Sequence, residues 1–502
     1  MQARHNGQSM AASVNVTELP AIAASQRQVD EPDGQLTLQR TLGSGQLILL
    51  GIGAIVGAGI FVSTGTVAAV YAGPAIVISF VLAGLGCLCA GLCYAEFAAM
   101  LPASGSAYSY VFAAFGRVPA WLIGWCLLLE YLMAAANVAV GWSGYAQGFL
   151  SSLGIRFPMA LGASPLGVAA GGAVILSGSW FNVPAVLILG GIALLLSRGV
   201  RLTVGVNTAL VTIKLAILAL FVACGAFFID PANWSPFLPP NRGTFGEYGW
   251  SGVVRGAGVI FYAYLGFDTV STAARETRNP QINLPIGIIG SLLICTVIYI
   301  LFALVLTGIA PYPILHVANP ISAALAHAGN RLLFLKVAVE IAALVGLTSV
   351  MLMLLYGQSR ILYAMAQDGL VPRKLGLIAP SSHAPQLAIV GGAAIAILAA
   401  GWLPMDVLAE LISIGTLCAF IFVCIAVLVL RVRRPALRRP FRVPAVWAIA
   451  PAGVAICGYL IAGLPAGTWM RFGAWTILGL VIYACYGRKR SSTAPRPTPF
   501  QP

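Results

Sequence analysis

Residues 51–65 read GIGAIVGAGIFVSTG, and this stretch decides which fold the chain can adopt. It lies inside an apolar segment, residues 45–70, that is long enough to cross a membrane as a helix. The stretch nevertheless contains five glycines, and a glycine weakens a helix interior by roughly 1 kcal/mol relative to alanine. So many glycines predict either that neighbouring helices pack very closely here or that the helix is interrupted.

The composition of the chain fixes its class. Of its 502 residues, 59% are hydrophobic and only 8% are charged, whereas a soluble domain carries about 25% charged residues. Apolar segments of about 20 residues, the length that crosses a bilayer as a helix, recur along nearly the whole sequence. We therefore expect an all-α, polytopic membrane protein that contacts the lipid bilayer.

The apolar segments predict twelve membrane-spanning helices. Their expected bounds are 45–70, 74–100, 119–149, 182–197, 203–228, 251–273, 284–309, 335–364, 386–403, 407–430, 444–463 and 470–486. The net charge of +14 is concentrated in short gaps between these segments, as the positive-inside rule requires, and not in a patch for nucleic acid. An even number of spans places both termini on one side, which the basic gaps predict to be the cytoplasmic side of the cell membrane.

The remaining segments complete the expected domain organisation. Residues 1–40 and 488–502 are predicted to be cytoplasmic tails, the first of them disordered; residues 41–435 are predicted to form a core of ten spans, and residues 436–487 two additional spans. The apolar stretch from Pro165 to Leu176 is too short to span and is expected to be a re-entrant or surface piece. The ten cysteines all lie in apolar stretches without disulfide or zinc spacing, so we expect no metal or other cofactor.

The glycines of the first span have two possible explanations. A break would free the N–H groups of Gly57, Ala58 and Gly59 at a half-helix N-terminus, where the helix dipole favours an anion such as a carboxylate. Alternatively, Gly53 and Gly57 form a GxxxG pair that lets a neighbouring helix approach. Taken alone, the stretch does not separate these explanations.

The sixth expected span favours the break. Residues 258–276 read GVIFYAYLGFDTVSTAARE, with Gly266 at mid-membrane and an acid, Asp268, two residues later. Interruptions at corresponding positions of two halves indicate an inverted-repeat transporter, with spans one to five related to spans six to ten. The two breaks would then meet, the first facing a carboxylate and the second offering carbonyl groups to an ammonium. Such a site fits a zwitterion.

Five stretches together resemble the amino acid–polyamine–organocation (APC) superfamily, and within it the bacterial cationic amino acid transporter (CAT) family. They are GAIVGAGIFVSTG (residues 53–65), YAEFAAMLPASGSAYSYVFAAFG (94–116), FNVPAVLILGGIALLLSRGVRLTVGVNTALVTIK (181–214), GFDTVSTAARETRNPQINLPIGI (266–288) and GQSRILYAMAQDGLVP (357–372). The resemblance implies the five-plus-five inverted repeat with spans one and six interrupted. It also implies a permease for amino acids rather than an enzyme.

The same resemblance assigns the substrate site. Backbone groups of the first break would hold the α-carboxylate and amine, and those of the second would complete the amine site, with Tyr262 also a candidate gate. The residues so assigned are Ile55, Gly57, Ala58, Gly59, Tyr262, Ala263 and Leu265. The sequence departs from the family pattern at Ala58, where a hydroxyl residue is common, and at Arg117 and Arg275, where acids are usual.

Among the charged residues inside the expected spans, Lys214 is the most isolated from opposite charge. It lies mid-span in VTIKLAILALF without an acid within one helical turn, and desolvation disfavours its charged form. The resemblance places it beside the broken first helix, where its protonation could couple proton movement to alternating access. The alternative is a permanent structural cation that never titrates.

Two acids complete the candidate site. Glu130, on span three, would contact the distal amine of a substrate or would be a protonated acid hydrogen-bonded within the bundle. Asp268 would bind the substrate amine or a proton, although capping of the following half-helix is its commoner use. Glu96, Glu276 and Arg360 are expected to be members of ion pairs away from the substrate.

These features predict a secondary active transporter, with proton symport favoured over amino acid exchange and a transporter-fold sensor as a minor alternative. A channel would need a continuous polar filter, and the scattered polar residues offer none. The substrate is either cationic, as Glu130 suggests, or small and neutral, as Ala58 suggests. No nucleic acid or obligate protein partner is expected.

Overall fold

The first expected span is interrupted in the structure, which is a computed structural model. Helix α2 (Ser44–Ile55) ends where Val56 adopts an extended conformation, with φ −75° and ψ 99°. The chain becomes helical again at Gly59, through the π-helical turn η2 (Gly59–Ser63), α3 (Thr64–Val67) and the second π-helical turn η3 (Ala68–Ala72). The described residues are 40–487 except 58, 104, 153, 156, 169–173, 177, 244–245, 317–319, 328, 330–332, 381 and 463–465. The expected tails therefore lie almost wholly outside them.

The second interrupted span has a similar organisation. Helix α9 (Gly249–Ile260) passes into a 3₁₀ turn, η8 (Phe261–Tyr264), and then into an irregular segment that contains Gly266. Gly266 has φ +109°, a conformation that residues with a side chain rarely adopt. The chain resumes with the short helix α10 (Thr269–Thr272) and the 3₁₀ turn η9 (Ala274–Glu276). Both breaks predicted from the glycines are therefore present.

Six helical segments within the described residues are long and apolar enough to cross a membrane, judged by length and composition. They are centred on α4 (Ile76–Met100), α6 (Arg117–Ser152), α8 (Val200–Gly225), α11 (Pro280–Ile309), α13 (Leu333–Gln367) and α15 (Met405–Arg433). Four further apolar helices are shorter, namely α2, α7 (Val183–Ser197), α14 (Gln386–Trp402) and α16 (Val446–Ala462). Helix α17 (Ala466–Ile482) follows at the C-terminal end. The structure is thus mostly helical and consistent with a polytopic membrane protein.

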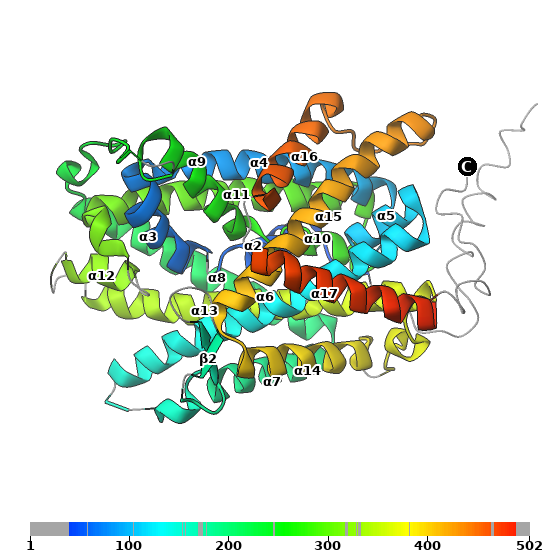
Figure 1. Cartoon of the computed structure of the whole chain (residues 1–502), viewed down its shortest axis with the longest axis horizontal. Helices are drawn as coiled ribbons and strands as arrows, with labels where there is room; N and C mark the ends of the chain where they lie inside the picture. The colour runs from blue at the N-terminus through cyan, green and yellow to red at the C-terminus, as the bar shows by residue number, and fades with distance from the viewer. Residues whose placement is uncertain are drawn as a thin grey trace, which may run out of the picture. The chain divides into compact units, whose positions relative to one another are not determined.

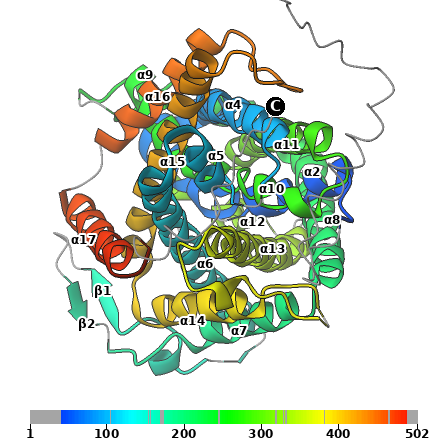
Figure 2. The same cartoon turned by 90° about the vertical axis from the view of Figure 1, so that its right-hand side faces the viewer.

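Helices that lie five expected spans apart pack against each other. Extensive contacts join α4 to α11, α6 to α13, and α7 to α14 (Figures 1 and 2). Helix α2 lies among α8, α11 and α13. The first break is consequently enclosed by other helices and not by lipid, which is the condition under which a membrane protein tolerates irregular backbone.

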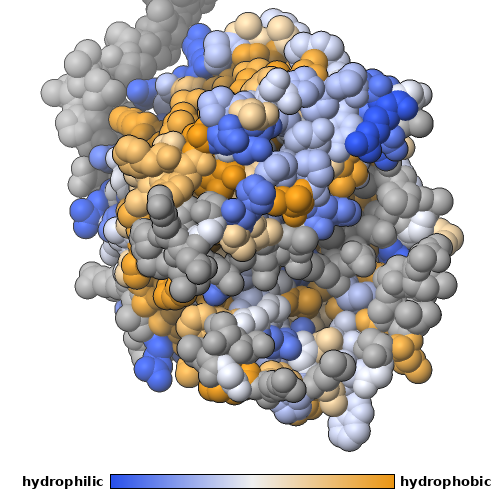
Figure 3. Space-filling model, turned by 90° about the vertical axis from the view of Figure 1, so that its left-hand side faces the viewer, coloured by the Kyte–Doolittle hydropathy of each residue, from blue (hydrophilic) through white to orange (hydrophobic). Residues whose placement is uncertain are grey.

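Apolar side chains also cover the outside of the helices. Leu187 and Leu194 on α7 are 69% and 58% exposed, and Val390 and Leu398 on α14 are 55% and 60% exposed. A soluble protein rarely presents apolar surface so continuously. Figure 3 views one end of the molecule, where hydrophilic residues gather in the upper part beside an apolar edge. These surfaces suit a protein whose sides face lipid.

One segment corrects the all-α prediction. Residues Leu166–Val168 (β1) and Val174–Leu176 (β2) form a two-stranded antiparallel hairpin. Valine and isoleucine recur in these strands, and β-branched side chains favour the extended backbone. The described parts of the stretch from Pro165 to Leu176 are therefore extended, and the stretch is too short to cross a membrane as a helix.

Several short elements were absent from the sequence prediction. Two are helices, α5 (Ala107–Phe115) and α12 (Pro320–His327). The others are single turns: η5 (Met159–Leu161), η7 (Pro231–Trp234), η10 (Tyr312–Leu315) and η12 (Arg373–Gly376). Three further turns, η4 (Gly73–Ala75), η6 (Ala226–Phe228) and η13 (Tyr483–Gly487), lie at the ends of the expected spans 74–100, 203–228 and 470–486. All of them lie at the ends of longer helices or in the connections between them.

Candidate functional site

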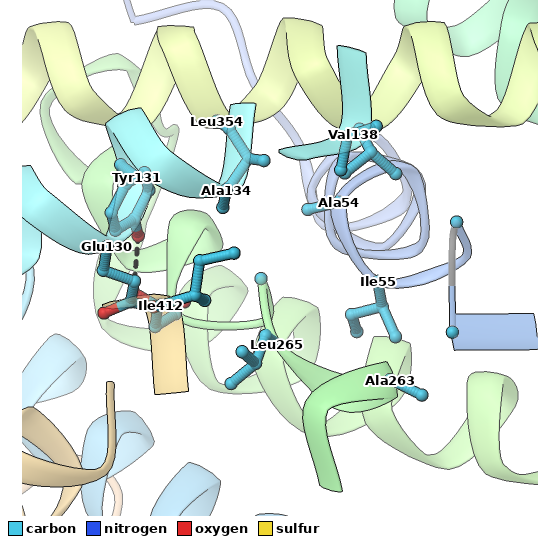
Figure 4. A pocket seen from close by; sticks show the side chains of 15 residues that line it. Ala54, Ile55, Glu130, Tyr131, Ala134, Val138, Ala263, Leu265, Leu354 and Ile412 are labelled. Atoms are coloured by element: carbon cyan, nitrogen blue, oxygen red, sulfur yellow. Dashed lines mark hydrogen bonds between the residues drawn. The ribbon is translucent and has the colours of Figure 1, made fainter. Parts of the chain in front are cut away.

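A cavity of about 40 Å³ lies where the two interrupted segments meet. It is enclosed by residues of α2 and η2, by η8 and the irregular segment after it, and by side chains of α6, α13 and α15 (Figure 4). Most of these side chains are apolar. The lining residues are Ala54, Ile55, Gly57, Gly59, Glu130, Tyr131, Ala134, Val138, Ala263, Leu265, Gly266, Asp268, Val350, Leu354 and Ile412.

The first break approaches the second so closely that only glycine fits. A side-chain carbon on Gly59 would lie 2.3 Å from Cβ of Ala263 and 2.5 Å from its Cα. At Gly57 such a carbon would lie 2.6 Å from a methyl carbon of Val350 on α13. All three distances are shorter than non-bonded carbon atoms allow. The glycines therefore allow close packing at the same place where the backbone leaves the helix. Close packing and interruption, the two explanations drawn from the sequence, do not exclude each other here.

Most residues predicted for the substrate site line this cavity. Ile55, Gly57 and Gly59 contribute from the first break, and Ala263 and Leu265 from the second. Ala58 lies outside the described residues. Tyr262 belongs to η8, but its side chain is outside the described part of the structure. Its assignment as a gate therefore stays a prediction.

Two carboxyl groups face the cavity. Glu130 and Asp268 are 4% and 1% exposed, and both line the cavity wall. Oε2 of Glu130 and Oδ1 of Asp268 make no hydrogen bond to any described residue. Within the described part of the lining there is no basic side chain. Two buried acids with free oxygens give the cavity a place for positive charge, either a proton or a cationic group of a ligand.

Capping by Asp268, the use favoured from the sequence, is wrong. Asp268 stands at the N-cap position of α10, but its side chain makes no capping hydrogen bond. Instead its Oδ2 accepts a hydrogen bond from the hydroxyl of Tyr131 on α6 (Figure 4). The backbone of Asp268 is itself helical, with φ −65° and ψ −24°, whereas a capping residue usually has an extended backbone; its carboxyl lines the cavity instead.

Lys214, on α8, binds the end of the first half-helix. Its Nζ donates to the carbonyl oxygens of Val56 at 2.7 Å and Gly53 at 3.2 Å, and to Oγ of Ser349 at 2.8 Å. The side chain is fully buried. The interruption of α2 leaves carbonyl groups at its C-terminal end without helical partners. The ammonium group of Lys214 binds two of them, and Oγ of Ser349 also donates to the Gly53 carbonyl, at 3.1 Å. Lys214 and the break were predicted to be neighbours, whereas Ser349 was not foreseen.

The residues expected to form ion pairs, Glu96, Glu276 and Arg360, are paired and are not among the residues that line the cavity. Nε of Arg360 donates to Oε1 of Glu276 at 2.8 Å, and both side chains are at most 2% exposed. Arg431 binds both oxygens of Glu96, at 2.9 and 2.7 Å. Arg275, one of the positions that depart from the family pattern, has its guanidinium carbon 5.4 Å from the ring centroid of Tyr363. These pairs join helix ends and are not part of the cavity wall.

Two tyrosines complete the site without having been predicted. Tyr131 holds Asp268, and Tyr299 on α11 places its hydroxyl 2.9 Å from the carbonyl oxygens of both Ile55 and Ala263. In the sequence each is one aromatic residue in a long apolar run, which is typical of ordinary packing. The available signal was weak: a buried tyrosine hydroxyl needs a partner, and freed backbone carbonyls are such partners. No group of three His, Cys, Asp or Glu side chains within the described residues could hold a metal ion.

An apolar helical bundle with two interrupted helices enclosing a cavity is the architecture of membrane transporters. Sequence comparison identifies the family: the amino acid permease family model matches residues 42–482. The chain therefore belongs to the amino acid permease family, which confirms the resemblance drawn from its motifs.

Individual relatives differ in what they carry. The branched-chain amino acid permease BcaP of Bacillus subtilis (strain 168) is 44% identical over 459 residues, covering 91% of this chain and 95% of that protein. The methylthioribose transporter of the same organism is 43% identical over 455 residues, with the same shares of 91% and 95%. The chloroplastic cationic amino acid transporter 9 of Arabidopsis thaliana is 37% identical over 461 residues, covering 91% of this chain and 78% of that protein.

Proposed function

We propose that this permease is a secondary active transporter that moves amino acids across the cytoplasmic membrane by alternating access. The observation that carries the proposal is the meeting of two interrupted helices at one buried cavity. The helical segment from Gly59 to Ala72 begins at the cavity and presents its positive dipole end to a carboxylate. Freed carbonyls and two carboxyl groups offer complementary partners for an ammonium. The cavity therefore suits the zwitterionic head of an amino acid.

The proposed architecture is a five-plus-five inverted repeat of twelve spans. The transport core covers residues 41–435, residues 436–487 add two spans, and both tails are cytoplasmic. The pairing of α4 with α11, α6 with α13 and α7 with α14 supports this proposal. In a repeat of five spans, each helix has its counterpart five spans later, and a pseudo-twofold axis brings such counterparts together.

We further propose that a proton is the coupling ion and that Lys214 carries it. The ammonium holds the end of α2 through two carbonyl groups. Loss of the proton would reduce its donors and its charge, and the broken helix would be held less tightly. Glu130 and Asp268, which line the cavity, would offer a second place for a proton. Amino acid exchange without a net proton is the alternative mechanism, and a transporter-fold sensor is a more remote one.

The cavity wall favours an amino acid with an apolar side chain. Aliphatic residues from α6, α13 and α15, including Val138, Leu354 and Ile412, surround the space beyond the two breaks. The name of BcaP, a branched-chain amino acid permease, points the same way. Glu130 and Asp268 leave a cationic side chain as the competing choice. A further candidate is methylthioribose, because a relative named for it is almost as similar as BcaP.

A binding panel separates these substrates. Purified protein in detergent would be tested by thermal shift with leucine, isoleucine, valine, alanine, arginine, lysine and methylthioribose. We expect the largest stabilisation with a branched-chain amino acid, since a ligand that binds only the folded state raises its melting temperature. Gly57→Leu, which fills the first break, should abolish the shift. A normal shift with that variant, or no shift with any amino acid, would reject the proposed site.

A further inference from the structure

A single hydroxyl group joins the two interrupted helices. The hydroxyl of Tyr299 lies 2.9 Å from the carbonyl oxygen of Ile55, the last residue of α2, and 2.9 Å from that of Ala263, in η8. These carbonyls come from segments more than two hundred residues apart in the chain, and both residues line the cavity. Tyr299 itself does not belong to the lining residues. It lies behind the site, on α11.

The position of this hydroxyl is fixed by packing. Tyr299 is 0% exposed. Its ring lies 5.1 Å from that of Phe80 on α4 and 5.3 Å from that of Tyr264 in η8. A ring held on both sides in this way has little rotational freedom, so its hydroxyl is presented at one point between the two breaks.

The chemistry of the hydroxyl determines what it can do for the two carbonyls. A tyrosine hydroxyl has one hydrogen to donate, and each carbonyl oxygen has two lone pairs. At any moment it can donate to Ile55 or to Ala263, so the two acceptors share one donor. The carbonyl oxygens of Ile55 and Ala263 can therefore accept further hydrogen bonds at the edge of the cavity. A substrate ammonium, which carries three N–H donors, can supply them.

We propose that Tyr299 is a positioning residue for substrate binding: it fixes the separation of the two breaks and aligns the Ile55 and Ala263 carbonyls toward the substrate ammonium. This inference rests on the proposed function, because it takes the ligand to be an amino acid bound at the breaks. The residue acts through the backbone and does not touch the substrate. Its loss should therefore weaken binding without preventing the transport cycle.

The test is Tyr299→Phe, which removes the hydroxyl and keeps the ring. Tyr264→Phe is the matched control, because Tyr264 is equally buried in the same aromatic cluster but its hydroxyl donates to the carbonyl of Phe80, at 3.0 Å. Uptake of radiolabelled leucine, or of the amino acid that the binding panel ranks first, would be measured in proteoliposomes over a range of concentrations. We expect KM to rise about tenfold in Y299F, as for loss of a buried hydrogen bond. In Y264F we expect less than about a twofold change.

The value of kcat separates positioning from general damage. A variant that is merely less stable lowers the amount of active protein and therefore Vmax, whereas KM does not depend on that amount. We expect Y299F to keep kcat per folded molecule close to the wild-type value. A wild-type KM in Y299F, or an equal rise of KM in Y264F, would overturn the inference while leaving the proposed function intact. If the wild-type protein transports no amino acid, the proposed function fails and the inference falls with it.

Discussion

Nζ of Lys214 lies 2.7 Å from the carbonyl oxygen of Val56, the residue at which the first half-helix ends. The same ammonium contacts Ser349 on α13, so one charged group connects α8, α2 and α13. The thiol of Cys295, on α11, is the titratable neighbour that faces it among the described residues. Val56 lies between Ile55 and Gly57, which both line the cavity, so Lys214 binds the backbone directly beside the cavity.

Replacing Lys214 should therefore separate substrate movement from proton movement. Lys214→Met keeps the length and apolar stem of the side chain but cannot donate to Val56 or Gly53. We expect K214M to lose amino acid accumulation driven by a pH gradient and to lose the pH dependence of uptake. The measurement is uptake in proteoliposomes with and without an imposed gradient. Lys374→Met, at an exposed position in η12, is the control and should behave as the wild type. An unchanged pH profile in K214M would show that another group carries the proton.

The contact between Gly59 and Ala263 supplies a second prediction. Gly59→Ala adds one carbon atom at a point where 2.3 Å is available, and the atoms it meets include backbone, which cannot rotate away. We expect the two breaks to move apart and substrate affinity to fall by at least about tenfold, with a stability loss of about 1–3 kcal/mol from overpacking. Binding would be measured by titration calorimetry and stability by thermal melting.

Gly391 provides the matched control for that substitution. It lies on α14, and a side-chain carbon added there would meet no atom within 4 Å. Gly391→Ala should keep both binding and stability. Equal affinities of G59A and G391A for the substrate would contradict the close apposition of the breaks as a binding requirement.

The breaks could be predicted from the sequence because glycines occur at corresponding positions of two expected spans, the first and the sixth. The glycines at 57, 59 and 266 stand where the backbone leaves the helix or where another segment approaches closely. Lys214 was equally visible, since an isolated charge in an apolar run requires a partner. In both cases the residue type, glycine or lysine, is unfavourable inside a membrane-spanning helix, and this indicates a functional position.

The remaining features depend on contacts between distant segments. Asp268 was expected to cap a helix because its local sequence permits it. Its carboxyl instead accepts a hydrogen bond from the hydroxyl of Tyr131, on another helix. Nothing near Tyr299 distinguishes it from a packing residue. The hairpin of β1 and β2 was missed since its apolar residues have no clear period over so short a length. Periodicity reports which face is buried, and it does not report which partner a polar group finds.

Asp368 gives a prediction about pH. This residue follows the end of α13, and its carboxyl accepts a hydrogen bond of 2.6 Å from the hydroxyl of Tyr108 on α5. Burial raises the pKa of Asp368 above its ordinary value of 3.8, although the Tyr108 hydroxyl and the charges of Arg275 and Arg117 oppose that shift. An acid with a raised pKa holds its proton more firmly in the folded state than in the unfolded state. Its contribution to stability is therefore complete below 3.8 and is lost as pH rises through the higher folded value.

Asp368→Asn should flatten this dependence. The amide keeps the shape of the carboxyl and cannot ionise, so we expect the melting temperature of D368N to fall less than that of the wild type as pH rises from about 4. Thermal melts in detergent across a pH series would measure the difference. Glu247→Gln, at an exposed carboxyl, should follow the wild-type curve. Parallel curves for D368N and the wild type would contradict the prediction.

The buried pair of Glu276 and Arg360 leads to the last prediction. Oε1 of Glu276 accepts the 2.8 Å bond from Arg360, its Oε2 accepts a hydrogen bond from Tyr356, and its backbone carbonyl accepts two N–H groups, those of Thr41 and Leu42, at 2.9 Å each. The pair thus ties the segment before α2 and the end of the second interrupted span to α13. Removing one partner leaves a buried charge without compensation, which costs about 3–5 kcal/mol.

We therefore expect Glu276→Gln and Arg360→Met each to lower the melting temperature strongly, whereas Arg433→Met, at an exposed position near the end of α15, should not. The double variant E276Q/R360M should be more stable than the sum of the single losses predicts, because the second substitution removes the charge that the first left unpaired. Melting of all four proteins in one detergent provides the double-mutant cycle. Strictly additive losses would mean that the two side chains contribute independently, and the pair would then have no role in holding the second break against α13.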